Sequence, residues 1–284
     1  DKHVVAIVDG DGGVLAKPMS FSEDLAGYQK LFELLGEPND ALVVLEATGH
    51  YWQNLCGALV GSGFAVAVIN PVRSRRFAEE DLARAKTDSI DAVSLARFGA
   101  QKKPLPTRLP DEATAELREL VRLRDRYVQD LGDRVRQLHR VVDLGFPEFT
   151  RHVSDLGSAL ATTLLKQYPT AAALRFQSPK KVAKLVYDGR HEVGLELATA
   201  LVQAAKTSVG RHHGAPFKLE AVHACEDIAI LRSRIRQLDK DMGTTIGNHD
   251  IGKLLLTIDG IGENTASRLI AELGDPSAFR DAAA

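Results

Sequence analysis

The spacing of apolar residues divides the chain into two regions of different character. Over residues 4–70, short apolar runs rich in β-branched residues alternate with stretches in which apolar positions recur every three or four residues. The first pattern is typical of strands and the second of amphipathic helices. We therefore expect strands at 4–9, 14–17, 41–46 and 64–70, and helices at 24–35 and 51–62. This alternation predicts an α/β layer with mixed strands.

From about residue 111 the pattern is helical. Apolar residues from Leu117 to Val142 recur at steps of three or four, which predicts one long amphipathic helix closed by Gly145 and Pro147. A less regular helical region follows at 154–209. Residues 218–247 then form a heptad seam of a/d type with charged flanks, which predicts coiled-coil packing. Its partner is either the long helix before it or a second copy of the chain, and the pattern does not decide between them.

Composition sets wide limits on the class of protein. The chain has 284 residues, 44% hydrophobic and 26% charged, which indicates a globular protein of two domains or three modules. Two cysteines, Cys56 and Cys225, exclude a disulfide framework and fit the reducing cytoplasm, where we place the protein. No apolar run is long enough to span a bilayer and no signal peptide is visible, so we expect no membrane partner.

Local charge says more than the net charge of −2. One basic cluster contains Arg73, Arg75, Arg76, Arg84 and Lys86, and seven further arginines lie along the long helix between residues 118 and 140. Such arginines can simply cover a solvated helix face. They can equally contact phosphate oxygens, which fit the guanidinium fork. The sequence leaves both interpretations open.

Three carboxylates form the first candidate site. Glu46 ends the 41–46 strand, which looks central and buried on both faces, and ligands of α/β sheets bind at the carboxyl ends of strands. Asp88 and Asp91 lie three residues apart at the start of a helix, so they share one face. Hard cations such as Mg²⁺ prefer carboxylate oxygens. Individually, each acid could be a solvent-facing or helix-starting residue instead.

The second candidate site is the stretch LLLTIDGIGENTASRLIAELGD at 254–275. An apolar run, the turn Gly260-Ile261-Gly262 and a helix at about 264–273 resemble a helix-hairpin-helix unit. Glycines there would let backbone N–H groups approach a phosphate. An ordinary helix-turn packing element is the alternative.

These stretches together resemble a known family. VVLEATGHYW, VINPVRSRRFA and AKTDSIDAVSLARF are similar to the acidic-domain signature of the DEDD-type insertion-sequence transposases (insertion sequence 110-like), and LLTIDGIGENTASRLIAELGD resembles the opening of their second domain. The resemblance implies an α/β plus all-α fold. It would comprise an RNase H-like (RuvC-like) domain at 1–149, a helical coiled-coil region at 150–250, and the start of a C-terminal transposase domain at 251–284.

The resemblance also assigns chemistry to individual residues. Of the family's four metal-binding acids, the second, third and fourth fall on Glu46, Asp88 and Asp91, and the first is expected on a strand before residue 1. The family's serine nucleophile is expected beyond Ala284. The implied reaction is phosphodiester transesterification with Mg²⁺, or Mn²⁺, as the cofactor.

The implied partners are double-stranded donor and target DNA and a structured non-coding bridge RNA. Arg73, Arg75, Arg76 and Lys86 are expected to contact nucleic-acid backbone, as is the turn Gly260-Ile261-Gly262. We also expect a homo-oligomer, a dimer or a tetramer. Two alternatives stay open, a RuvC-like hydrolytic nuclease such as a junction resolvase, and a non-catalytic coiled-coil protein that binds RNA.

Overall fold

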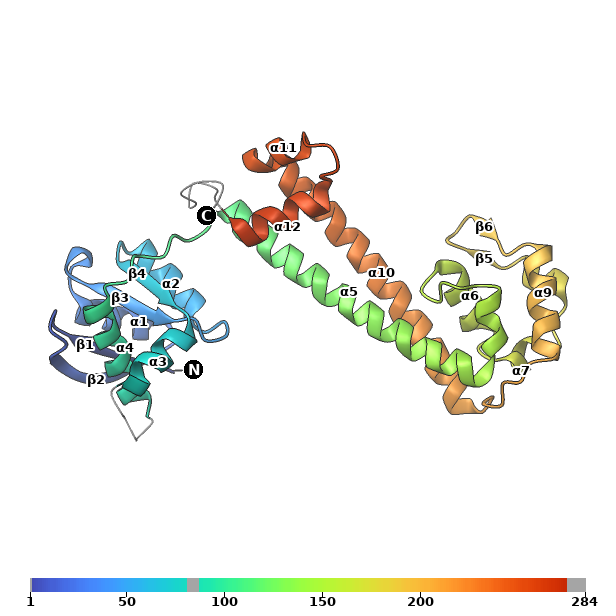
Figure 1. Cartoon of the computed structure of the whole chain (residues 1–284), viewed down its shortest axis with the longest axis horizontal. Coiled ribbons are helices and arrows are strands. Elements are labelled where there is room, and N and C mark those ends of the chain that lie inside the picture. Colours follow the sequence, from blue (N-terminus) through green and yellow to red (C-terminus); the bar gives the residue numbers. More distant parts are fainter. Residues whose placement is uncertain (1, 81–86, 275–284) are drawn as a thin grey trace. The chain divides into compact units, whose positions relative to one another are not determined.

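The structure is a computed structural model that describes residues 2–80 and 87–274, so the predicted contact residue Lys86 lies outside the described residues. It divides into two compact units, Asp1–Leu109 and Pro110–Ala284. Figure 1 shows the strands β1 to β4 in the first unit and long helices in the second. The α/β region followed by a helical region confirms the mixed fold class.

The first unit is an α/β layer with two strand pairs. Strands β1 (Lys2–Val8) and β2 (Val14–Ser22) are antiparallel, and β3 (Leu42–Glu46) runs parallel to β4 (Ala65–Ile69), with Glu46 opposite Ile69. The helices are α1 (Leu25–Leu35), α2 (Trp52–Gly61), α3 (Pro71–Glu80) and α4 (Asp88–Lys102), and a short 3₁₀ turn, η1, covers Pro38–Asp40. The predicted order of strands and helices up to residue 70 is therefore confirmed.

The burial of β3 differs from the prediction. We expected this strand to be central and buried on both faces, but its residues are half-buried and Leu42 is exposed. The buried residues of this pair lie on β4, at Val66, Ala67 and Ile69. The reason is pairing: among the described strands β3 pairs with β4 alone, so its other edge is open.

The second unit is built on two helices of 34 residues each, α5 (Glu112–Gly145) and α10 (Ala215–Asn248). The predicted seam of α10 is buried along most of its length and packs on α5, with Ile228 at 0% and Met242 at 1% exposure. Ion pairs Arg124–Asp239 and Arg140–Glu220 show that the helices are antiparallel. The partner of the seam is thus α5 of the same chain, and the seam gives no support to self-association.

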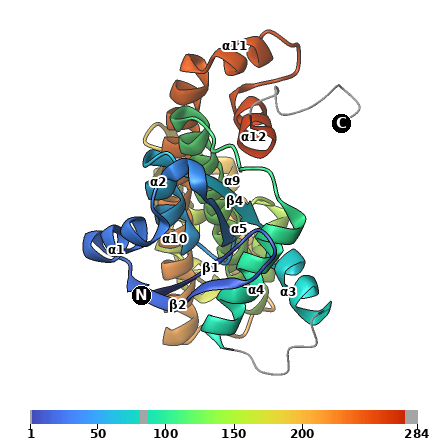
Figure 2. The same ribbon diagram turned by 90° about the vertical axis from the view of Figure 1, so that its left-hand side faces the viewer.

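A helical lobe and a short helical pair cover opposite ends of α5 and α10 (Figure 1), and the short pair is seen in red at the top of Figure 2. The lobe packs on the C-terminal half of α5. It contains η2 (Pro147–Arg151), α6 (Ala159–Gln167), α7 (Ala171–Leu174), α8 (Pro179–Ala183), β5 (Val186–Tyr187), β6 (His191–Glu192) and α9 (Leu195–Lys206). At the other end α11 (Asp250–Leu256) and α12 (Glu263–Leu273) pack on Leu117 of α5 and Ile246 of α10.

The unit boundary differs from the predicted domain boundary. By its contacts α5 belongs to the second unit, whereas the predicted domain 1–149 grouped it with the strands; the three-domain division stays a prediction. None of the helices in the described stretches is long and apolar enough to cross a membrane.

Candidate active site

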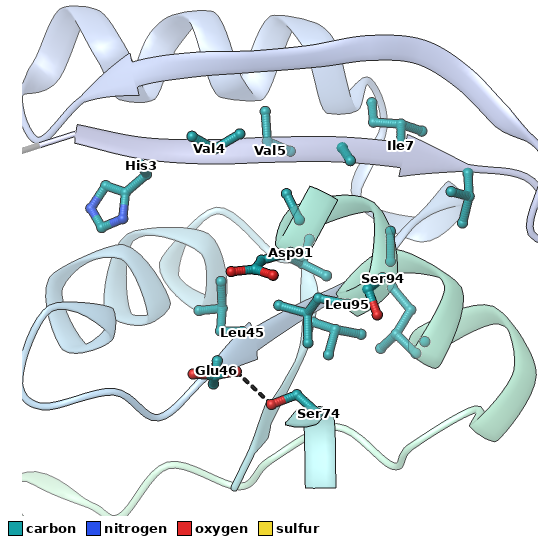
Figure 3. Close-up of a pocket in the computed structure, with 18 of the residues that line it drawn as sticks. His3, Val4, Val5, Ile7, Leu45, Glu46, Ser74, Asp91, Ser94 and Leu95 are labelled. Carbon is teal, nitrogen blue, oxygen red and sulfur yellow. Dashed lines mark hydrogen bonds between the residues drawn. The ribbon is translucent and has the colours of Figure 1, made fainter. Parts of the chain in front are cut away.

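A cavity of about 1250 Å³ lies inside the first unit, between the two strand pairs. It is lined by residues of β1 from Lys2 to Val8, by residues of β3 from Leu42 to Glu46, and by one face of α4. Figure 3 shows β1, the end of β3 and α4 around it. Because β1 pairs only with β2 and β3 only with β4 in the described sheets, each has an edge without a neighbouring strand. The cavity wall therefore includes backbone groups that a sheet would normally pair.

Glu46 is held at the mouth of this cavity by two hydroxyl groups. Thr48 Oγ donates to Glu46 Oε1 at 2.6 Å. Ser74 Oγ donates to Glu46 Oε2 at 2.5 Å, along the dashed line of Figure 3. Thr48 is close because the chain turns at once after β3, where its N–H donates to the Glu46 carbonyl at 2.8 Å. Ser74 comes from the first turns of α3. The carboxylate is therefore fixed in orientation by groups from two elements.

Asp88 and Asp91 lie in the first turn of α4. Thr87 caps this helix by accepting the N–H of Ile90 at 3.3 Å, which leaves both acids free of a capping role. Both side chains are exposed, and both line the same cavity as Glu46. Their position favours helix α4 electrostatically, since negative charge stabilises a helix N-terminus. Neither carboxylate forms an ion pair within residues 2–80 and 87–274.

The three acids fit a divalent cation in chemistry. Carboxylate and hydroxyl oxygens are the ligands that Mg²⁺ and Mn²⁺ prefer. The three side chains come from two elements, β3 and α4, and reach one cavity. Across the described stretches, however, no three His, Cys, Asp or Glu side chains lie close enough together to form a cage for an ion. A shared metal ion on Glu46, Asp88 and Asp91 therefore stays a prediction.

The predicted basic residues of α3 differ in their surroundings. Arg75 is exposed and lines the cavity, and Arg76 is exposed as well. The guanidinium of Arg73 lies over the Phe98 ring, 5.5 Å from its centre, which gives it a partial packing role. None of the three pairs with an acid in the parts of the chain that the structure describes. A role in nucleic-acid contact stays a prediction for all of them.

The arginines of α5 have a different role. Arg124 pairs with Asp239 at 2.6 Å, Arg134 with Asp227 at 3.2 Å, and Arg140 with Glu220 at 3.5 Å. Arg118 donates to the Ala271 carbonyl at 2.7 Å, and so joins α5 to α12. Of the two interpretations that the sequence left open, these four residues favour helix packing over phosphate contact.

The turn Gly260-Ile261-Gly262 joins α11 to α12 as the sequence predicts. Gly260 has a φ of 89°, a conformation that favours glycine, and Ile261 packs toward the buried cluster of Leu117 and Ile246. Gly262 caps α12 without a side-chain acceptor, so no side chain among the described residues accepts from the N–H groups of the first turn. The acid Glu263 lies in that turn and would oppose a phosphate there. Phosphate binding by this turn stays a prediction.

Sequence reasoning missed the two hydroxyls that hold Glu46. Thr48 carried a usable signal, since it lies two residues after a strand-end acid and within reach of its side chain. Ser74 carried none, because its contact with Glu46 joins residues 28 positions apart on different elements.

Comparisons with known proteins identify relatives over the whole chain. A transposase family model defined by the DEDD transposases of IS110 matches residues 1–147, and the model of the IS116/IS110/IS902 transposase family matches residues 252–284. The mini-circle protein of IS117 from Streptomyces coelicolor, named as a transposase, is 30% identical over 99% of this chain and 71% of its own length.

Two further relatives extend this comparison. A 44.8 kDa protein of the insertion element IS116 from Streptomyces clavuligerus is 24% identical over 99% of this chain and 70% of its own. The pilin gene-inverting protein of Moraxella lacunata is 31% identical over 34% of this chain and 30% of its own.

Proposed function

Because the chain belongs to the IS110 family of DEDD transposases, we propose that it carries the acidic half of an RNA-guided DNA recombinase that uses a divalent metal ion. Its substrates are double-stranded donor and target DNA, and a structured bridge RNA directs it to them. Family membership supports action on DNA. The guide RNA, the metal and the chemistry are the finer parts of the proposal.

One observation supports the metal site most strongly. Glu46 on β3 lies 42 positions before Asp88 and 45 before Asp91 on α4, yet all three side chains line a single cavity. Carboxylates that line one cavity without cationic partners repel each other, and a divalent cation or a phosphate-bound metal would compensate their charge. The two hydroxyl donors on Glu46 add orientation, which is the usual role of groups that surround metal ligands.

In this mechanism the chain binds and orients. Glu46, held by Thr48 and Ser74, and the α4 pair Asp88 and Asp91 would hold Mg²⁺ or Mn²⁺ against a DNA phosphate. A divalent ion there supplies electrostatic stabilisation for the charge that develops on the phosphate oxygens. Arg75 lines the same cavity and would contact the neighbouring DNA backbone. The proposed nucleophile is a serine, as the family pattern implies.

The open edges of β1 and β3 support a further part of this proposal. A strand lying between them would pair with both, close the sheet and bring its own side chains next to Glu46. In the family pattern the first of the four acids lies on such a strand, ahead of β1. We therefore place that acid on a strand that would lie between β1 and β3, next to the cavity. The RNase H-like sheet order is part of this proposal.

Calorimetric titration with Mn²⁺ and Mg²⁺ tests the site on the chain itself. We expect Glu46→Gln and Asp91→Asn each to weaken metal binding at least tenfold, since each removes one charged ligand. Glu33→Gln is the matched control, because Glu33 is an exposed acid on α1 away from the cavity. Equal affinity in all variants would contradict the site.

A recombination assay tests the chemistry. It uses a longer protein, in which this chain is joined to the strand expected to carry the first acid and to the segment expected to carry the serine. Asp88→Asn and Asp91→Asn should abolish strand exchange and leave RNA binding within a factor of two. A covalent protein–DNA adduct trapped during the reaction distinguishes a serine nucleophile from the water of a hydrolytic nuclease. Strand exchange at wild-type rate in either variant would reject the metal role of that residue.

A further inference from the structure

The helical lobe of the second unit carries a long stretch without acids. Residues 156–187 contain no Asp or Glu, although 38 of the 284 residues are acidic and the average would give about four in such a stretch. The same stretch contains five cations, which are Lys166, Arg175, Lys180, Lys181 and Lys184. Charge is therefore segregated in this lobe.

Four of these cations form no ion pair with an acid among the described residues. Lys166 pairs with Glu226 of α10 at 2.9 Å and has a structural partner. Arg175, Lys180, Lys181 and Lys184 are all exposed, and none forms an ion pair with a carboxylate of the described residues. Lys181 Nζ donates instead to the uncharged side-chain oxygen of Gln177, at 3.4 Å. These four side chains with Phe176 are called here the α7–α8 surface.

Phe176 gives this surface an aromatic face. Its side chain is 80% exposed, and the Arg175 guanidinium lies over the ring, 4.6 Å from its centre. An exposed phenylalanine leaves apolar area in contact with water, so a ligand that covers the ring gains free energy. A flat ring beside a guanidinium is the arrangement on which an unpaired nucleobase stacks.

The surface is presented on an ordered turn. Leu174 on one side and Val182 on the other are buried in the lobe core at 2% and 0% exposure. The Gln177 N–H donates to the Leu174 carbonyl at 2.9 Å, and the Lys181 N–H donates to the Ser178 carbonyl at 2.9 Å. The backbone that carries the aromatic ring and the lysines is thus held in place before any ligand binds, which lowers the entropic cost of binding.

We propose that the α7–α8 surface binds an unpaired segment of RNA, with a base stacked on Phe176 and the neighbouring phosphates contacted by Arg175, Lys180, Lys181 and Lys184. The phosphates would supply the negative charge that the four cations lack, and an unpaired base would cover the exposed ring. Duplex DNA fits less well, because its bases are already stacked on each other. The choice of RNA rests on the proposed function, in which the RNA is the partner that supplies unpaired bases.

Fluorescence anisotropy with the full chain tests this inference. The probe is a labelled 12-nucleotide RNA without secondary structure, in buffer with EDTA so that metal binding plays no part. Phe176→Leu keeps an apolar side chain but removes the ring, and we expect it to weaken binding about tenfold. Phe176→Trp keeps the ring and should bind at least as tightly as the unchanged chain.

The lysines are tested by a matched pair of double variants. Lys180→Ala with Lys181→Ala should weaken binding and lower the slope of log affinity against log salt by about 1.4, from two lost contacts with a single strand. Lys218→Ala with Lys240→Ala removes two exposed lysines from α10 and should change affinity less than twofold.

Several outcomes would overturn the inference. Unchanged binding by Phe176→Leu would remove the stacking role, and equal losses in both lysine pairs would indicate unspecific attraction. Tighter binding of DNA of the same sequence, or a duplex equally sensitive to Phe176→Leu, would reject RNA. Because the assay contains no free metal, its failure leaves the metal titration of Glu46 untouched, and the two proposals fail separately.

Discussion

The packed helices α5, α10 and α12 of the second unit and the cavity of the first unit use their charged side chains in opposite ways. In the second unit Arg124, Arg134 and Arg268 each pair with an acid on another helix, so the charges hold elements together. In the first unit, the exposed acids of α4 and the exposed arginines of α3 form no ion pair among residues 2–80 and 87–109. An arginine opposite an acid from a neighbouring helix is part of the fold, whereas an unpaired charge at a cavity is available to a ligand.

Packing differs in the same direction. The second unit has one large core that continues from α5 and α10 into the lobe, with many side chains fully buried. In the first unit the apolar strands β1 and β3 contain no fully buried residue, because each has an open edge beside the cavity. We therefore expect stability to depend mainly on the second unit, and ligand binding by the acids to depend on the first.

The largest effect on stability is expected at the seam of α10. Ile228→Ala removes a fully buried side chain and should lower the free energy of unfolding by about 2–5 kcal/mol. Urea unfolding followed by circular dichroism measures it. Ile230→Ala, on the same helix but 48% exposed, is the control and should change stability by less than about 0.5 kcal/mol. Similar losses in both variants would contradict the packing described here.

A smaller effect is expected at the ion pair that joins the long helices. Arg124→Ala should cost about 1–2 kcal/mol, because the Arg124 side chain is only 18% exposed and holds Asp239 across the pair. A double-mutant cycle with Asp239→Ala should give a coupling of at least about 0.5 kcal/mol. The exposed Arg126 on the same helix provides the control. Equal losses of stability in Arg124→Ala and Arg126→Ala would contradict a stabilising role for the Arg124–Asp239 pair.

A third effect concerns acid. The Thr114 N–H, which donates to Asp111 at 2.8 Å, lowers the pKa of this N-cap below its ordinary value of 3.8. Because the pKa of Asp111 is lower in the folded state than in the unfolded state, its ionised carboxylate stabilises the fold at pH values above 3.8. This stabilisation is lost as the pH falls through the pKa of the folded state. Asp111→Asn keeps a good cap without a titrating group. Urea unfolding at pH 6 and pH 3 should therefore show a smaller acid loss in Asp111→Asn than in the unchanged chain.

The smallest stability effect is expected in the first unit. Arg75→Ala with Arg76→Ala removes exposed side chains without ionic partners in the described chain, so the free energy of unfolding should stay within about 0.5 kcal/mol. Nucleic-acid affinity should nevertheless fall, with a weaker salt dependence. A stability loss like that of Arg124→Ala would show that these arginines also hold the fold together.

Much of the fold was predictable because long periodic patterns are reliable. The helix expected from residue 111 to about 144 spans 112–145, and the seam at 218–247 lies within a helix of 215–248. Two-residue strands such as β5 and β6 are too short to give a period, and they were not predicted. The prediction that β3 is buried on both faces was wrong for a different reason, since the burial of a strand depends on its neighbours in the sheet and not on its own composition.

The candidate site was partly predictable as well. Glu46, Asp88 and Asp91 stood out because a strand-end acid and an i, i+3 pair have local signatures. Their meeting at one cavity, the hold of Ser74 on Glu46 and the choice of α5 as partner of α10 all depend on contacts between distant residues. Local patterns contain no information on such contacts.

The length of the two long helices sets a distance in the second unit. Thirty-four residues at 1.5 Å each make α5 about 51 Å long. The lobe with Phe176 packs at one end of this rod and the Gly260 turn at the other, so the rod acts as a rigid spacer between them. A nucleic acid laid along the whole of this rod would cover roughly fifteen base-pair steps of 3.4 Å each.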